Sequence, residues 1–396
     1  MKKWIALLLS LTLCLGLCAC GAAPAAEPEE DGVHKIGVIV YNTGDEEVIG
    51  FREYLQGYIE DNFEMVKFIY SGSIETPEQE MKFIQDACDS GAEGFLSFLS
   101  YDLKAEVELC GKNGAYYLLA SGTVSDDAFE SVADNPWFLG AFGPGSVFEF
   151  TAGADLVRYF LREKLGYNFF VLSGGAAMGN EMHYQRTLGI LDTLCSSFGV
   201  YPLKSREEMA RSEKPYTWDA GAFIVTICPG YVSREEYMDI ARETFAARKY
   251  DAVLSVLPPL DFVDAAGDTP FGVVDSYNTR NLQLSTEGRL RFVVGKYSSL
   301  VGPAFALMLN AVTGYAGDFR DNGRAVKVTQ GFWTSDSRED YSEKYALSAS
   351  AAMNAYNFED LSRVIRIYNP DATLNELIAL AEACSYNSVL ARRNVG

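Results

Sequence analysis

Short apolar runs alternate with helix-like patterns along most of this 396-residue chain, and this alternation limits its fold more than any other feature. The first run, residues 36–40, is followed by apolar residues at helical spacing, including Phe51 and Leu55. Further runs of the same kind occur at residues 66–70, 94–98, 115–119 and 137–140. Strands that read as continuous apolar runs are typical of a parallel sheet with helices on both faces. We therefore expect an α/β protein with doubly wound parallel sheets.

The alternation restarts after a long helical pattern at residues 147–165, which predicts a second, similar lobe. Strands are predicted there at residues 169–172, 223–226, 252–256 and 272–274. Helix-start signals occur in both halves and near the end of the chain, at Thr76 with Pro77, Ser233 with Glu236, and Thr373 with Glu376. Two such lobes leave a cleft between them, and ligands of open parallel sheets bind outside the carboxyl ends of the strands.

The charge balance excludes several function classes. Lys and Arg number 33 against 54 Asp and Glu, so the net charge of −21 repels phosphate backbones and anionic lipid head groups. Nucleic acid is therefore not expected as a partner. The two histidines, His34 and His183, leave little material for a His-rich zinc site or a Ser-His-Asp triad. We expect no metal and no cofactor.

The N-terminus has the layout of an export signal. Lys2 and Lys3 precede an apolar run at residues 4–19, which is too short to span a bilayer comfortably. The run ends in Leu17-Cys18-Ala19-Cys20, which resembles a bacterial lipobox with Cys20 as the lipid-attachment site. The alternative is an ordinary secretory signal cut elsewhere. We predict a signal peptide at 1–19, a flexible tether at 20–32, and an exported protein that is lipid-anchored at the outer face of the cytoplasmic membrane or periplasmic.

Five cysteines follow Cys20, without a C-x-x-C pair. Their odd number and wide spacing argue against a disulfide framework or a zinc ribbon. We expect them to be mostly buried apolar residues: Cys88, Cys110, Cys195, Cys228 and Cys384.

Four stretches taken in order carry a family resemblance. Residues 35–40 form an apolar opening strand, and residues 89–95 read Asp-Ser-Gly-Ala-Glu-Gly-Phe. Arg186 precedes Gly189 by three residues, and the strand ending in Asp275 is followed by the apolar run 290–294 and Gly302. Their order resembles type I periplasmic-binding proteins, in the sugar-binding branch that includes the ribose- and galactose-binding proteins. The resemblance covers about residues 35–330.

This resemblance implies a monomer of two lobes joined by three chain crossings, near residues 142, 296 and 328. Lobe one would comprise residues 33–142 and 297–327, and lobe two residues 143–296 and 328–396 with C-terminal helices. The implied function is a solute-binding protein, not an enzyme, that carries a small polar ligand, a carbohydrate, to the permease of an ABC importer. Two features depart from the family: Lys296 stands where Gln or Asn is common, and the tail after Asp336 is longer than a minimal sugar-binding protein requires.

Residues that follow the predicted strands are the candidate ligand contacts. A sugar needs aromatic faces and paired hydrogen-bonding groups. The candidates are Tyr41, Asn42, Asp45, Tyr101, Asp102, Ser121, Arg186, Trp218, Asp275 and Lys296. Arg186 is the strongest candidate, because the resemblance implies that the arginine of this motif reaches the cleft. The alternative is that Arg186 is a surface arginine paired with Asp192 or Glu181. Asn42, Asp102 and Asp275 are alternatively turn residues, and Trp218 alternatively a surface contact of lobe two.

Other interpretations stay open. The same closure is compatible with a receptor component sensed by a membrane kinase or chemoreceptor. An exported carbohydrate hydrolase using Asp102 and Asp275 is a further alternative. His183 is expected to form hydrogen bonds rather than catalyse. The glycine-rich residues 173–179 lack the Lys-Ser/Thr of a phosphate loop, and their glycines are expected to let the backbone turn beside the cleft.

Overall fold

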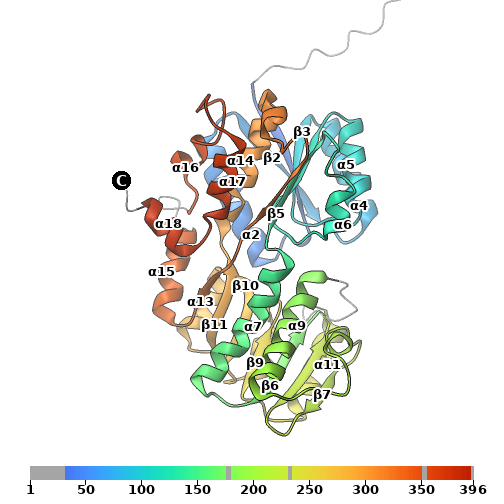
Figure 1. Cartoon of the computed structure of the whole chain (residues 1–396), viewed down its shortest axis with the longest axis vertical. Helices are drawn as coiled ribbons and strands as arrows, with labels where there is room; N and C mark the ends of the chain where they lie inside the picture. Colours follow the sequence, from blue (N-terminus) through green and yellow to red (C-terminus); the bar gives the residue numbers. More distant parts are fainter. Residues whose placement is uncertain (1–31, 175–179, 231–233, 350–354, 394–396) are drawn as a thin grey trace, which may run out of the picture. The chain divides into compact units, whose positions relative to one another are not determined.

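Six parallel strands form the first sheet of this computed structural model, in which residues 32–174, 180–230, 234–349 and 355–393 are described (Figure 1). Across the sheet the strands are β12 (Val326–Thr329), β5 (Phe138–Gly143), β4 (Tyr116–Leu119), β3 (Ala92–Ser97), β1 (His34–Val40) and β2 (Val66–Ser73). This sheet and its helices are lobe one. Successive residues of β4 pack into different cores, Tyr117 on one face and Leu118 on the other, because strand side chains alternate.

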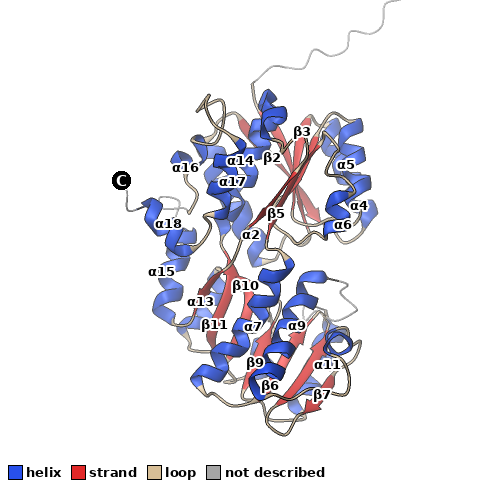
Figure 2. Cartoon of the chain, in the orientation of Figure 1, coloured by secondary structure: helices blue, strands red, loops and turns tan. Residues whose placement is uncertain are grey.

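Helices cover both faces of the first sheet, as Figure 2 shows. The helices of lobe one are α2 (Glu46–Arg52), η1 (Glu53–Ile59), α3 (Glu60–Asn62), α4 (Pro77–Asp89), α5 (Leu103–Lys112), α6 (Asp126–Glu130), η2 (Ser298–Val301), α14 (Gly302–Asn310), η3 (Ala311–Tyr315) and η4 (Ala316–Phe319). The predicted cap is confirmed: Thr76 forms a capping box with Gln79, and Pro77 opens α4. Among the described residues, Ser298–Phe319 is the one stretch apolar and long enough to cross a membrane, but most of it is buried within the fold.

The second sheet, of seven strands, builds lobe two. Its order is β13 (Trp333–Ser335), β11 (Leu290–Lys296), β10 (Phe271–Ser276), β9 (Ala252–Ser255), β6 (Asn168–Ser173), β8 (Ile224–Pro229) and β7 (Tyr216–Asp219). The two edge strands, β13 and β7, are antiparallel to their neighbours and the rest are parallel. The helices are α7 (Ser146–Glu163), α9 (Glu181–Phe198), α10 (Arg206–Ala210), α11 (Glu235–Ala246), α12 (Phe262–Ala266), α13 (Thr279–Thr286) and α15 (Arg338–Ala349).

The predicted fold class of two doubly wound α/β lobes is confirmed. Sequence patterns missed the short strands β7, β12 and β13, which are three or four residues long and lie at sheet edges. Apolar runs mark strands buried on both faces, whereas an edge strand such as β7 alternates between half-buried and exposed residues. The capping box at Thr373 is confirmed. Ser233 and residues 175–179 of the glycine-rich loop lie outside the described residues, as does Cys20.

The C-terminal helices correct the predicted lobe assignment. Residues 328–396 were expected in lobe two, yet α16 (Phe358–Ser362) and α17 (Leu374–Glu382) contact α14 of lobe one, and α17 also contacts β12. The helix α18 (Tyr386–Arg393) follows, and Tyr386 packs against Trp333. The extension therefore returns to lobe one, because α14 presents apolar surface that these helices bury.

The C-terminal extension also forms hydrogen bonds with two segments that link the sheets, at Tyr297 and Trp333. The Tyr297 hydroxyl, just after β11, donates to the backbone oxygen of Cys384 at 2.9 Å. The indole nitrogen of Trp333 donates to the same oxygen at 2.8 Å, and its ring stacks on Tyr297 with centroids 3.9 Å apart.

The five described cysteines are free thiols, and all but the half-buried Cys88 are buried.

Candidate ligand-binding site

The carboxyl ends of both parallel sheets bring charged side chains together where the lobes meet. Asp45 follows β1 and caps α2, where its side chain accepts a hydrogen bond from the Glu47 amide at 2.9 Å. Lys296, the last residue of β11, is 3 % exposed and pairs with the Glu47 carboxylate at 3.1 Å. This ion pair joins lobe one to lobe two. We call Asp45, Glu47, His183, Arg186, Asp275 and Lys296 the interlobe site.

Two carboxyl groups of the interlobe site are perturbed by their surroundings. Burial, followed by the nearby Glu47 carboxylate, raises the pKa of Asp45 to about 6. Burial, followed by the Asp45 carboxylate, raises the pKa of Asp275 to about 7. Asp275 also accepts a hydrogen bond from the Asn281 amide at 2.7 Å. Among nearby carboxylates, Asp45 of lobe one therefore has the largest electrostatic effect on Asp275. Asp102, the partner that the hydrolase alternative requires, is not among the groups that shift the pKa of Asp275.

The raised pKa of Asp275 predicts a pH dependence of stability. The folded state holds this proton more tightly than the unfolded chain does, so the stabilisation is complete below about pH 4 and is lost as the pH rises through about 7. Between pH 7.5 and pH 5 the unfolding free energy of the wild type should gain about 2 to 4 kcal/mol more than that of Asp275→Asn. Urea unfolding at a series of pH values measures this difference, and parallel curves for the two proteins would contradict it.

Arg186 is buried, so the alternative of a surface arginine is wrong. It lies on α9, is 6 % exposed, and its Nε donates to the Glu149 carboxylate of α7 at 2.5 Å. Its Nη1 donates to the backbone oxygen of Val256, beyond β9, at 2.8 Å. Glu149 also accepts from the Thr123 hydroxyl, which follows β4, at 3.3 Å. Arg186 is thus held within a network that reaches both lobes.

Several buried polar atoms near these strand ends have no hydrogen-bond partner among the described residues. They belong to Ser121 after β4, Ser173 at the end of β6, His183 near the start of α9, Ser299 after β11 and Gln330 after β12. A buried polar group without a partner costs about 1 to 3 kcal/mol, so each implies a missing water or ligand atom. Ser121, Ser173, Ser299 and Gln330 follow or end parallel strands at the edge where ligands of open sheets bind, and His183 lies in the first turn of α9, the next described helix after β6.

His183 is neutral within this site. Burial, followed by the charges of Arg186 and Lys296, lowers its pKa to about 3. Gly174 is required beside it, because a Cβ on Gly174 would lie 2.6 Å from the Nδ1 atom of His183. A neutral imidazole offers one donor and one acceptor to a ligand.

The other candidates have different positions. The Tyr41 side chain bonds to Asp45 and thereby contacts the site. Asn42 accepts from the Gly44 amide at 2.9 Å, and Asp102 caps α5 by accepting from the Ala105 amide at 3.1 Å, so both have local turn or cap roles. Tyr101 is 47 % exposed beside Asp102. Trp218 lies on the edge strand β7 opposite Val225, at the amino end of β8, and packs on Phe223, away from the interlobe site.

Sequence reasoning missed the acidic partners Glu47 and Glu149, and also Glu106. The Glu106 carboxylate accepts from the backbone amides of Tyr101 and Asp102 at 2.9 and 2.7 Å and thereby fixes the loop after β3. It is buried beside Glu80, whose pKa is raised to about 9 by burial and then by Glu106. An acidic residue on the buried face of a helix was the one available signal, since such residues are rarely buried without a partner.

The comparisons with known proteins support the same architecture. No protein-family model and no curated protein sequence matches the chain. Among solved structures, the arabinose-binding component of an ABC transporter from Shewanella sp. ANA-3 is 13% identical, with a TM-score of 0.55, covering 78% of this chain and 94% of its own. A solute-binding protein from Bacillus halodurans C-125 with bound myo-inositol gives 16% identity, a TM-score of 0.56, and coverage of 80% and 99%.

A third solved structure, a periplasmic solute-binding protein from Actinobacillus succinogenes 130z with bound D-allose, is 10% identical, with a TM-score of 0.58 and coverage of 78% and 99%. The chain has the type I periplasmic-binding-protein fold. At these identities the likeness concerns the fold alone. The helices α15 to α18 all lie beyond residue 330, where the family resemblance in the sequence ends.

Proposed function

We propose that this protein is an extracytoplasmic solute-binding protein that closes its two lobes around a small, uncharged, hydroxyl-rich ligand, a sugar or sugar-like molecule. The observation that carries the proposal is the set of buried, unpartnered polar atoms at the carboxyl ends of strands from both sheets. The three solved proteins of the same fold support it, because arabinofuranose, myo-inositol and D-allose are bound to them.

The charge pattern supports an uncharged ligand. Both cations of the interlobe site already have carboxylate partners, Lys296 with Glu47 and Arg186 with Glu149. A sugar acid or phosphate is not needed to neutralise them, which argues against the acidic ligand that Lys296 alone suggests. Hydroxyl groups both donate and accept, so they fit the free oxygens of Ser121 and Ser173 and the ring nitrogen of His183.

Entry of the ligand requires the lobes to open. The cavity beside Asp45 and Asp275, walled by Pro258, Pro259 and Asn281, measures about 30 Å³, which suits a water molecule rather than a sugar. Hinge opening and closure of this kind is the established way for two-lobed binding proteins to admit and release ligands. In this proposal Cys20 carries the lipid that anchors the protein, and the closed form delivers its ligand to an ABC-transporter permease.

The test is native mass spectrometry and thermal unfolding of the full chain in mild detergent with monosaccharides, inositols, sugar acids and nucleosides. A neutral sugar or polyol at about 100 times its dissociation constant should stabilise the protein by about 2.7 kcal/mol. Asp275→Ala should weaken that ligand at least tenfold, whereas Trp218→Phe, on the far edge of the second sheet, should leave it unchanged. Stabilisation by none of these compounds would contradict the proposal.

A further inference from the structure

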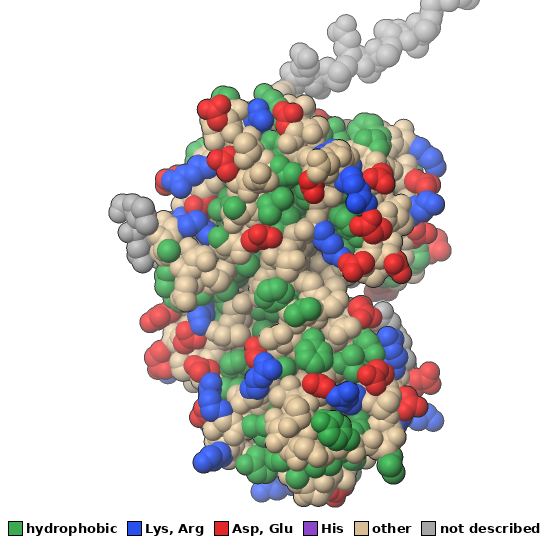
Figure 3. Space-filling model, viewed as in Figure 1, with side chains coloured by type: hydrophobic (Ala, Val, Ile, Leu, Met, Phe, Trp, Pro, Cys, Tyr) green, Lys and Arg blue, Asp and Glu red, His purple; other side chains and the backbone are tan. Residues whose placement is uncertain are grey.

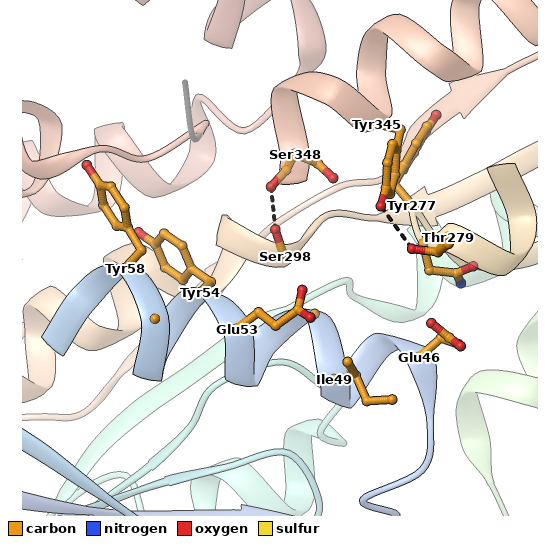
Figure 4. A pocket seen from close by; sticks show the side chains of 13 residues that line it. Glu46, Ile49, Glu53, Tyr54, Tyr58, Tyr277, Thr279, Ser298, Tyr345 and Ser348 are labelled. Carbon is orange, nitrogen blue, oxygen red and sulfur yellow. Dashed lines mark hydrogen bonds between the residues drawn. The ribbon is translucent and has the colours of Figure 1, made fainter. Parts of the chain in front are cut away.

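A second cavity, of about 290 Å³, lies beside the segments that link the lobes. It shares Glu46 and Asn278 with the small cavity beside Asp275, but none of the six residues of the interlobe site lines it. One wall is the helical segment formed by α2 and η1 of lobe one (Figure 4). The opposite wall comes from the β10–α13 loop, the first residues of α13 and η2, and α15, with Tyr277, Thr279, Ser298, Tyr345 and Ser348. An occupant would therefore contact both lobes. The volume suits a small ligand.

The helical wall has two carboxylates separated by an apolar stretch. Glu46, Ile49, Gly50 and Glu53 all line the cavity, as expected for positions i, i+3, i+4 and i+7 on one helix face. Seven residues of helix span about 10.5 Å, which is close to the separation of the terminal nitrogens in extended spermidine. Gly50 leaves the space between the two acids open, since a Cβ there would meet only Ser298 at 3.5 Å.

These carboxylates have no ion-pair partner in the described part of the chain, and no Lys or Arg lines the cavity. Acidic and basic side chains are interspersed over the face shown in Figure 3. The opposite wall supplies tyrosine rings, which attract organic cations. It also supplies Ser348, which is fully buried and whose Oγ has no hydrogen-bond partner among the described residues. This oxygen is an independent sign of an absent polar ligand atom.

We propose that this cavity binds a linear aliphatic diamine or polyamine, with its two terminal ammonium groups at Glu46 and Glu53 and its chain along Ile49 and Gly50. The two acids match the terminal ammonium groups, and the internal ammonium of a polyamine such as spermidine would lie beside the tyrosine rings of the opposite wall. The strongly negative net charge of the protein, −21, favours approach of such a cation. This site goes beyond the proposed solute-binding function, because its ligand and its lining differ from those of the interlobe site.

The test is isothermal titration calorimetry of the full chain in mild detergent, without sugar, at constant ionic strength. Spermidine should bind with one-to-one stoichiometry and at least ten times more tightly than ethylenediamine or butylamine, which cannot reach both acids. Glu46→Gln and Glu53→Gln should each weaken spermidine about tenfold. Glu108→Gln, an exposed acid on α5 with no ion partner among the described residues, is the matched control and should change nothing.

A further variant separates shape from charge. Gly50→Leu keeps both carboxylates and is compatible with a helix, but it fills the space between them, and it should weaken spermidine at least tenfold. The proposal is overturned if spermidine does not bind at millimolar concentration, if Mg²⁺ at equal concentration displaces it fully, or if Glu108→Gln weakens it as much as Glu53→Gln. Because no sugar is present, these outcomes are independent of whether the interlobe site binds one.

Discussion

Replacing Glu149 with alanine is expected to lower the free energy of unfolding by about 3 to 5 kcal/mol. Glu149 has no exposed surface, and it is the carboxylate partner of the buried Arg186. Its removal leaves the guanidinium buried, and among the described residues its remaining partners are the Val256 backbone oxygen and the face of Phe332, 5.8 Å from its ring centre. Urea unfolding measures the change, and a fall in ligand affinity should accompany it, because Arg186 belongs to the interlobe site.

Asp155→Ala is the matched control for this experiment. Asp155 lies on the same helix, α7, and pairs with an arginine, Arg158, at 2.8 Å, but that arginine is 59% exposed. Its loss should cost less than about 1 kcal/mol. The double variant Glu149→Leu with Arg186→Met, which removes both charges, should regain most of the stability lost in Glu149→Ala. Equal effects of Glu149→Ala and Asp155→Ala would show that burial of the pair is unimportant.

Gly189→Ala is expected to destabilise the protein by about 3 kcal/mol or more, which is at or above the usual cost of overpacking. The helices α7 and α9 approach so closely that a Cβ on Gly189 would lie 1.9 Å from the backbone oxygen of Phe150. A Cβ on Gly153 of α7 would lie 1.8 Å from the backbone oxygen of Arg186. Backbone cannot yield as a flexible side chain can, so the two helices must separate and Arg186 must move relative to Glu149.

Gly57→Ala is the control for Gly189→Ala in the same urea unfolding experiment. Gly57 lies in the helical segment η1, and no atom of the described residues lies within 4 Å of a Cβ placed on it. Alanine should therefore stabilise the protein by about 0.5 to 1 kcal/mol, because it restricts the unfolded chain and favours the helix. A Gly189→Ala variant as stable as the wild type would mean that the helices do not pack as closely as described.

A site residue could be predicted from the sequence only where it lies at or just after the carboxyl end of a parallel strand. Asp45, Asp275 and Lys296 follow or end parallel strands, and parallel topology alone places such residues at one edge. Trp218 shows the opposite case: its polar surroundings suggested a loop at the cleft, whereas it belongs to an antiparallel edge strand whose pairing sets it at the far end of β8. The identity of an edge strand depends on its neighbour, which local sequence does not specify.

The sequence by itself determined the two α/β lobes and most strand positions, because a strand buried on both faces needs a continuous apolar run. It also determined the positions of the capped helices at Thr76 and Thr373. Only the tertiary structure decided which charges meet. Lys296 and Glu47 are 249 residues apart, and their pairing follows from how two sheets face each other rather than from any periodicity. The return of α16 and α17 to lobe one was likewise decided by the apolar surface of α14. The apolar pattern of a helix shows that one face is buried, but it does not show which other helix covers that face.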